Sequence, residues 1–160
     1  MDSILELREW VKSLYAQNGQ NPDRLWIEPY SYTYSVTGLS AVGGTSAGQL
    51  AINANADFVC TRISYTASVG TVQTLGTKPI AQVRATIIDA GSARPFFNTA
   101  TALENFASNE YPNRFLPYPR WLSANTTLSI QLVGYGTAAE TYGIDLTFEG
   151  VAVRQYSGGM

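Results

Sequence analysis

Residues 142–149 read Tyr-Gly-Ile-Asp-Leu-Thr-Phe-Glu, with an apolar side chain at every second position. Because successive side chains of a strand point to opposite faces, this period of two predicts a strand with one face in a core and the other in solvent. Residues 128–133 alternate in the same way. Past Gly150 the apolar positions change from even to odd, at Val151 and Val153. We interpret this slip as a β-bulge at Gly150, since one inserted residue changes which side chains face the core.

Further strands are predicted where runs of β-branched and aromatic residues are separated by Gly, Asn, Ser and Pro, at residues 49–52, 58–65, 71–75, 80–89, 126–133 and 142–154. The fold expected is mainly β, an antiparallel, jelly-roll-like β-sandwich. Periodicity does not specify the order of the strands. Residues 94–122 are less regular and rich in aromatic residues and proline. They predict a long loop that packs over an open edge or end of the sandwich, or that itself forms an interface.

The amino-terminal segment predicts one helix, over residues 3–17. Ser3 and Glu6 have the spacing of a capping box, and an apolar stripe follows at Ile4, Leu7, Val11 and Leu14. A helix this short is marginal on its own in water. It is therefore expected to dock on its own sandwich, on a symmetry mate or on another protein.

Residues 30–36 alternate aromatic and hydroxyl side chains, at Tyr30, Tyr32 and Tyr34 on one face, with Trp26 just upstream. Two interpretations stay open: an ordinary first strand of the sandwich, or an arm that adds a strand to the sheet edge of a neighbouring subunit. The organisation predicted is a helix and extended aromatic arm over residues 1–38 and a β-sandwich domain over residues 39–160. The predicted partner interface consists of Ile4, Leu7, Val11, Leu14, Trp26, Tyr30, Tyr32 and Tyr34.

The composition is unusual in its charge. Hydrophobic residues make up 45% and charged residues 14%, against about 25% charged in typical domains. The surface must then be formed mainly by uncharged polar side chains, or part of it must be buried by a bound partner. The net charge of −2 and scattered basic residues argue against nucleic acid and an anionic membrane as partners. The sequence shows no signal-peptide pattern and no apolar stretch near the roughly 18 residues of a membrane span, so folding in a cytoplasm is expected.

The residues needed for common catalytic sites are missing. The sequence contains no histidine, which removes the usual general base and the commonest neutral metal ligand. Residues 44–48 match the G-x-S-x-G pattern of a hydrolase nucleophile, but that site needs a histidine and a strand-to-helix elbow. We interpret them as a flexible glycine-rich loop. Asp145 and Glu149 are expected to be solvated, Cys60 to be a buried small hydrophobe, and residues 125–127 to form a turn. No enzyme activity, cofactor or metal is therefore expected.

One resemblance covers about the last 45 residues. Residues 118–130, Tyr-Pro-Arg-Trp-Leu-Ser-Ala-Asn-Thr-Thr-Leu-Ser-Ile, followed by residues 142–154, resemble the closing strands of small β-sandwich structural proteins of tailed bacteriophage virions. The amino-terminal helix and aromatic arm have no counterpart in that pattern. The resemblance implies a virion location after assembly in the host cytoplasm. It also implies self-association, commonly as a homotrimer, and binding to the major capsid protein or other virion proteins.

Three functions follow as expectations. The first is a capsid cement or decoration protein that reinforces the shell. The second is a neck, collar or tail-adaptor protein, whose copy number would be set by the portal axis. The third, from another class, is a carbohydrate-binding module that stacks sugars on Trp26, Trp121 or the face formed by Tyr30, Tyr32 and Tyr34.

Overall fold

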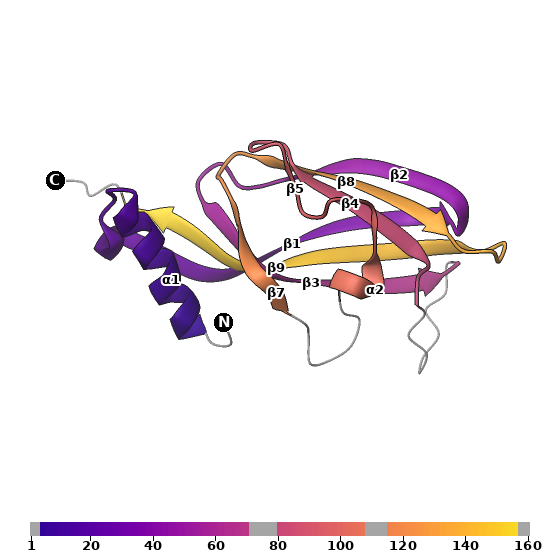
Figure 1. Ribbon diagram of the computed structural model, residues 1–160, viewed down its shortest axis with the longest axis horizontal. Coiled ribbons are helices and arrows are strands. Elements are labelled where there is room, and N and C mark those ends of the chain that lie inside the picture. Colours follow the sequence, from indigo (N-terminus) through magenta and orange to yellow (C-terminus); the bar gives the residue numbers. More distant parts are fainter. Residues whose placement is uncertain (1–3, 71–79, 108–114, 157–160) are drawn as a thin grey trace.

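The computed structural model describes residues 4–70, 80–107 and 115–156. Two antiparallel sheets pack as a sandwich, and a helix lies at one end of it (Figure 1), which confirms the predicted fold class. In chain order the elements are α1 (Ile4–Gln17), η1 (Pro22–Arg24), β1 (Leu25–Ser40), β2 (Val42–Ala51), β3 (Asp57–Val69), β4 (Val83–Asp89), β5 (Arg94–Pro95), β6 (Thr101–Ala102), α2 (Leu103–Phe106), β7 (Phe115–Leu122), β8 (Thr127–Tyr135) and β9 (Thr141–Gln155).

The strand order is that of a jelly roll. One sheet has the order β1-β9-β3-β7 and the other β2-β8-β4-β5, with the short β6 also paired to β4. Along the chain the strands cross repeatedly from one sheet to the other, which is how a jelly roll nests its Greek keys. We call these the β1 sheet and the β2 sheet. The jelly-roll-like topology expected from the sequence is therefore present.

The main core lies between the two sheets. The even-numbered residues of β9 from Tyr142 to Phe148 face inward and are buried, Leu146 and Phe148 completely. They meet Ile87, Ile130 and Leu132 of the β2 sheet in one apolar cluster. The alternation predicted for residues 142–149 and 128–133 thus places the side chains as expected, because a pleated strand sends every second residue to the same side.

The change of apolar positions after Gly150 has a different cause from the one predicted. β9 pairs with β1 without interruption from Ile144 to Gln155, so it contains no bulge at Gly150. The extra residue is Thr61 in β3, because Gly150 pairs with Cys60 and Glu149 with Arg62. Val151 and Val153 still point away from the main core, and they are buried because α1 covers that face. A second core, which periodicity cannot reveal, accounts for the slip.

Glycine is required at position 150 for a steric reason. A Cβ placed there would collide with the carbonyl group of Val59. The bulge in β3 brings the two backbones this close, and glycine is the residue that permits such an approach.

The amino-terminal helix begins at Ile4, as expected for a helix over residues 3–17; Ser3 of the capping box lies outside the described residues. Of the three docking partners considered, α1 uses its own sandwich. Residues 25–40 pair with β9 of the same chain, so the segment forms an ordinary first strand here. The boundary predicted between residues 38 and 39 falls inside this strand. Exchange of the segment between copies stays a prediction.

Two segments predicted as loops contain strands. Residues 44–48 lie in β2, and Gly48 is glycine because a Cβ would meet the ring and hydroxyl of Tyr34. Residues 94–122 hold β5, β6, α2 and β7, with Pro117 and Pro119 in β7. Proline is tolerated there because β7 is an edge strand. The strand predicted at residues 71–75 lies outside the described residues.

Candidate partner-binding surfaces

The helix α1 is held on the outward face of the β1 sheet by a second apolar core. Leu7, Val11 and Tyr15 of α1 are buried against Val59 of β3 and the odd-numbered valines of β9. Each such side chain contributes roughly 1.5–3 kcal/mol of gross stabilisation when it is fully buried. An isolated helix of this length is only marginally stable in water, and burial against the sheet supplies the stability that it needs.

A polar clamp fixes the carboxyl-terminal half of α1. The hydroxyl of Tyr15 donates to Oδ2 of Asp57 at 2.5 Å, and the backbone N–H of Ala124 donates to Oδ1 of the same carboxylate at 2.7 Å. The Tyr15 ring also packs on Trp121 with 5.1 Å between ring centres. Burial, together with the bond to Asp57 and its negative charge, raises the pKa of the Tyr15 hydroxyl well above 10.0. One side chain thus ties the helix to β3 and to β7.

A first groove of about 470 Å³ lies where the amino-terminal turns of α1 meet strands β1, β3, β7 and β9. Ile4, Leu7, Tyr30, Phe115 and Val151 supply its apolar lining. Ile4, Tyr30 and Phe115 are 52%, 40% and 45% exposed, respectively, so the lining is open to a partner.

The charges in the first groove are already neutralised. Arg62 forms an ion pair with Glu149, and its guanidinium lies 5.9 Å from the centre of the Phe115 ring. Glu149, expected to be solvated, is instead partly covered by this pair, whereas Asp145 is exposed as expected. An apolar partner entering the groove would therefore meet a paired charge, which is cheaper to cover than an isolated one.

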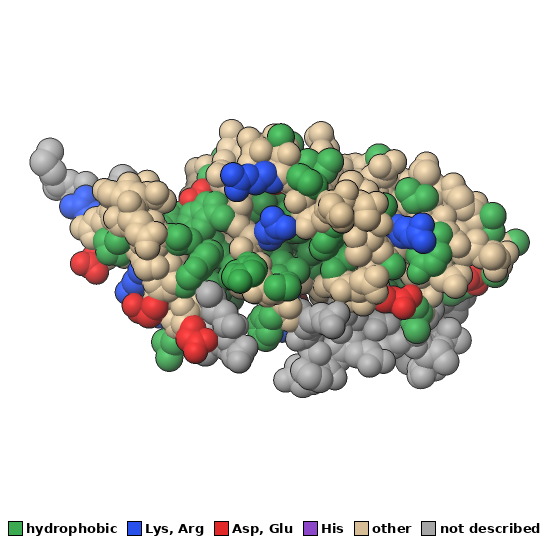
Figure 2. Space-filling view, viewed as in Figure 1, with side chains coloured by type: hydrophobic (Ala, Val, Ile, Leu, Met, Phe, Trp, Pro, Cys, Tyr) green, Lys and Arg blue, Asp and Glu red, His purple; other side chains and the backbone are tan. Residues whose placement is uncertain are grey.

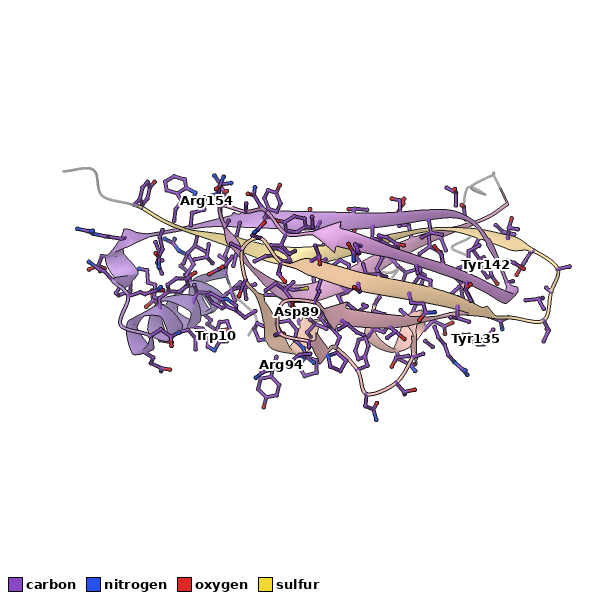
Figure 3. All side chains as sticks on the ribbon, turned by 90° about the horizontal axis from the view of Figure 1, so that it is seen from above. Trp10, Asp89, Arg94, Tyr135, Tyr142 and Arg154 are labelled. Atoms are coloured by element: carbon purple, nitrogen blue, oxygen red, sulfur yellow. The ribbon has the colours of Figure 1, made fainter. Side chains whose placement is uncertain are left out.

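A second groove of about 420 Å³ runs along the other half of α1. Trp10 and Leu14 face Phe96, Trp121 and two arginines across it; the guanidinium of Arg120 donates to the carbonyl of Phe96 at 2.8 Å and lies 5.1 Å from the centre of its ring. Figure 2 shows hydrophobic side chains gathered between α1 and the middle of the sandwich, with basic side chains beside them. In Figure 3, Trp10, Asp89 and Arg94 lie along this part of the molecule.

Asp89 at the rim of the second groove has a structural role. Its carboxylate accepts hydrogen bonds from the N–H of Gly91 at 3.0 Å and from the hydroxyls of Ser92 at 2.5 Å and Thr126 at 3.0 Å. Burial alone would raise the pKa of Asp89, but these hydrogen bonds outweigh it and lower the pKa. The carboxylate closes the turn after β4 and is not available as a general base.

The predicted interface residues divide into two groups. Leu7 and Val11 lie on the face of α1 that is buried against the β1 sheet. Tyr32 and Tyr34 pack on the main core, where Tyr32 contacts Phe58 edge-on with 4.9 Å between ring centres. These four serve the chain's own packing.

The other four remain at the surface. Ile4 and Tyr30 line the first groove and Leu14 lines the second. Trp26 is 50% exposed; its indole N–H donates to Glu28 at 3.2 Å and its ring lies against Tyr156. Their role in binding a partner stays a prediction.

Several residues that contact α1 or line the grooves were not among the predicted interface residues. Tyr15 follows Val11 at the four-residue spacing of the apolar stripe, so the pattern could have included it. Trp10 flanks the same stripe. Phe115 and Trp121 could not have been placed, because β7 was interpreted as part of a loop.

No metal-binding group is found in the part of the chain that the structure describes. That part has no group of three or more Cys, Asp or Glu residues able to hold a metal ion. Cys60 is fully buried, which raises the pKa of its thiol to about 12, so it is the small hydrophobe that was expected. Ser46 lies within a strand and not at an elbow. None of the helices in residues 4–70, 80–107 and 115–156 has the length and apolar character needed to cross a membrane.

Comparison with known proteins finds only distant structural matches. No protein-family model matches the sequence, and no curated protein matches it. Two solved structures that match are the infectious bursal disease virus VP2 subviral particle (13% identity, TM-score 0.31) and the infectious bursal disease virus Gx strain (14% identity, TM-score 0.32). Each match covers 86% of this chain but only 39% and 38%, respectively, of those chains. Similarity at this level says nothing about function, and the resemblance to tailed-bacteriophage proteins stays a prediction.

Proposed function

We propose that this chain is a non-enzymatic structural protein of a virus particle, and more specifically a capsid cement or decoration protein of a tailed bacteriophage. The observation that carries the proposal is where the exposed apolar side chains lie. Three of them, Ile4, Tyr30 and Phe115, line one groove at the amino-terminal end of α1, and the described residues hold no group of side chains able to bind a metal ion. Jelly rolls are common among viral capsid proteins, although the fold alone does not assign a function.

The first groove suits a partner that supplies apolar side chains. Ile4, which is 52% exposed, lines it, and the neighbouring Leu5 on α1 is 67% exposed. Burying each such side chain contributes at most about 3 kcal/mol, so the two together offset only the lower part of an association cost of about 4–15 kcal/mol. A single copy would thus bind weakly, and binding to a shell would gain from several copies acting together. This supports a homo-oligomer, for which the resemblance favours a trimer. A neck or collar position would instead give a ring.

The carbohydrate-binding alternative has one observation in its favour. The second groove combines Trp10 and Trp121 with the exposed Arg94, which is the mixture of ring surfaces and polar groups that sugar sites use. Trp121 is already engaged by Tyr15, however, and this reduces the ring surface that a sugar could use. Binding to a glycan array that is lost on Trp10→Ala would support this alternative.

The test of the proposed function is shell binding. Capsids would be purified from the source virus with the gene for this chain deleted, mixed with the protein and sedimented. A double variant, Ile4→Glu with Leu5→Glu, should weaken binding at least about tenfold, because carboxylates replace the apolar contacts. The matched control is Val42→Glu with Val69→Glu, which adds the same charge at exposed positions on the opposite end of the sandwich.

The control variant should bind like the wild type. Equal binding by wild type and the Ile4 and Leu5 variant would refute the role of this groove. Absence of shell binding by the wild type would refute the cement proposal itself.

A further inference from the structure

The two long sides of the sandwich differ in how their strand edges are protected. On one side the edge strands are β7, with Pro117 and Pro119, and the two-residue strands β5 and β6, with Pro95 in β5. Proline and short length are two devices by which proteins prevent edge strands from pairing with other chains. On the other side the edges are β1 and β2, which are long.

The β1 and β2 edges lack these protections. No strand within the described residues pairs with the outer edge of either one. From Pro29 to Ala56 the sequence has no charged residue, although charged residues make up 14% of the chain. A neutral edge gives no charge complementarity to a charged partner, and it allows two identical edges to meet without repulsion.

The middle of β1, whose outer backbone edge is unpaired within the described residues, has a sequence that is complementary to itself. Residues 30–36 read Tyr-Ser-Tyr-Thr-Tyr-Ser-Val, which is nearly the same in both directions about Thr33. If two copies pair antiparallel with Thr33 opposite Thr33, then Tyr32 lies opposite Tyr34 and Ser31 opposite Ser35. Aromatic and hydroxyl pairs of this kind stabilise neighbouring strands.

The ends of this segment also match. Pro29, which has no N–H to donate, would lie opposite Thr37, where the pairing of β1 with β9 shifts register between Val36 and Leu39. Both features would end the hydrogen-bonded pairing of the two β1 strands at the same residue pair. We propose that a second copy of this chain binds at this edge, with β1 pairing to β1 about a two-fold axis through Thr33.

The surface area that such a contact would bury is typical of a dimer that forms reversibly. Residues 30–36 span about 24 Å at about 3.4 Å per residue. Tyr34 covers Gly48, so β2 lies level with this segment and its edge would approach the partner as well. With sheets about 10 Å apart, the two edges give roughly 1,000 Å² of buried surface in total, near the lower limit for specific pairs. The dimer should therefore dissociate on dilution.

This inference does not rest on the cement proposal, because it concerns self-association in the absence of shells. It does differ from the trimer that the resemblance favours. A two-fold contact relates two copies, so a trimer would have to use another surface.

Sedimentation velocity over a range of concentrations tests the pair. The wild type should change from monomer to dimer as concentration rises. Thr33→Lys should raise the dissociation constant roughly tenfold or more, because two like charges face each other at the axis. Ser64→Lys is the matched control: Thr33, Thr147 and Ser64 form one row across the β1 sheet, and Ser64 lies two strands from the edge.

The control should dimerise like the wild type. A wild type that stays monomeric, or a trimer whose mass is unchanged by Thr33→Lys, would overturn the inference. Circular dichroism checks that both variants are folded.

Disulfide trapping tests the register. Opposite residues of antiparallel strands have Cα atoms about 4.5–5.5 Å apart, which suits a disulfide. Thr33→Cys should therefore give a covalent dimer when diamide oxidises the two thiols, and Ser64→Cys should not. The native Cys60 is completely buried and cannot take part without unfolding. Equal cross-linking of both variants, or none at Thr33→Cys, would contradict the proposed axis.

Discussion

Removal of one hydroxyl group at the α1 contact should destabilise the whole chain. Tyr15→Phe keeps the ring against Trp121 and deletes the 2.5 Å hydrogen bond to Asp57. A hydrogen bond to a charged group contributes about 1.5–3 kcal/mol. Asp57 keeps its bond from Ala124, so we expect a loss near the middle of this range, about 2 kcal/mol at pH 7. For a chain of this size that lowers Tm by about 4–8 °C.

The effect should depend on pH in a definite direction. The pKa of Tyr15 is raised in the folded protein, so its stabilising contribution is complete below the unfolded value of 10.0 and declines as pH rises above it. One unit above that value the wild type loses about 1.4 kcal/mol through this group, and Tyr15→Phe does not. The difference between the two proteins should therefore shrink from about 2 kcal/mol at pH 7 to below about 1 kcal/mol at pH 11.

Urea unfolding followed by circular dichroism at pH 7 and pH 11 measures both quantities. Tyr118→Phe is the control, because Tyr118 is 82% exposed, and its stability should equal that of the wild type at pH 7. A difference between wild type and Tyr15→Phe that is absent at pH 7, or the same at both pH values, would refute the role assigned to this hydrogen bond.

Two further substitutions test the backbone and the turn after β4. Gly150→Ala should cost about 1–3 kcal/mol in urea unfolding, since the added methyl group collides with the Val59 carbonyl. Gly143→Ala should cost less, because its methyl group would come close only to the movable Ser68 hydroxyl and reach the Val36 carbonyl at an ordinary contact distance. Equal losses of stability in the two variants would contradict the close approach at Gly150. Asp89→Asn should cost about 2 kcal/mol at pH 7. Because the folded-state pKa of Asp89 is lowered, its stabilisation is present above 3.8 and is lost as pH falls below it, so the difference from the wild type should shrink near pH 3; a constant difference would contradict this.

Predictions from the sequence succeeded where one element could be judged by its own pattern. The helix was found because its apolar stripe and length are local features, and the strands at residues 128–133 and 142–149 because period two requires no knowledge of partners. The same local reasoning failed for β7, where two prolines suggested a loop. Proline is excluded only where an N–H must bond to a neighbour, and edge position is a property of the sheet.

The candidate surfaces could be predicted only in part. The sequence indicated that Ile4, Tyr30 and Trp26 are apolar residues near the amino terminus, and all three remain at the surface. Tyr32 and Tyr34 share the alternation of Tyr30 yet pack on the main core, because the β2 sheet covers their end of β1 and not the end beside α1. A repeating pattern gives the direction of a side chain but not what lies opposite it.

The sequence therefore established a charge-poor β protein with one amphipathic helix and no histidine, since composition and periodicity are properties of the chain itself. The jelly-roll order, the bulge at Thr61 and the docking of α1 over Val151 and Val153 came from the folded molecule. These features depend on which distant segments meet. Many pairings satisfy the same alternation of apolar and polar residues, and packing in three dimensions selects one of them.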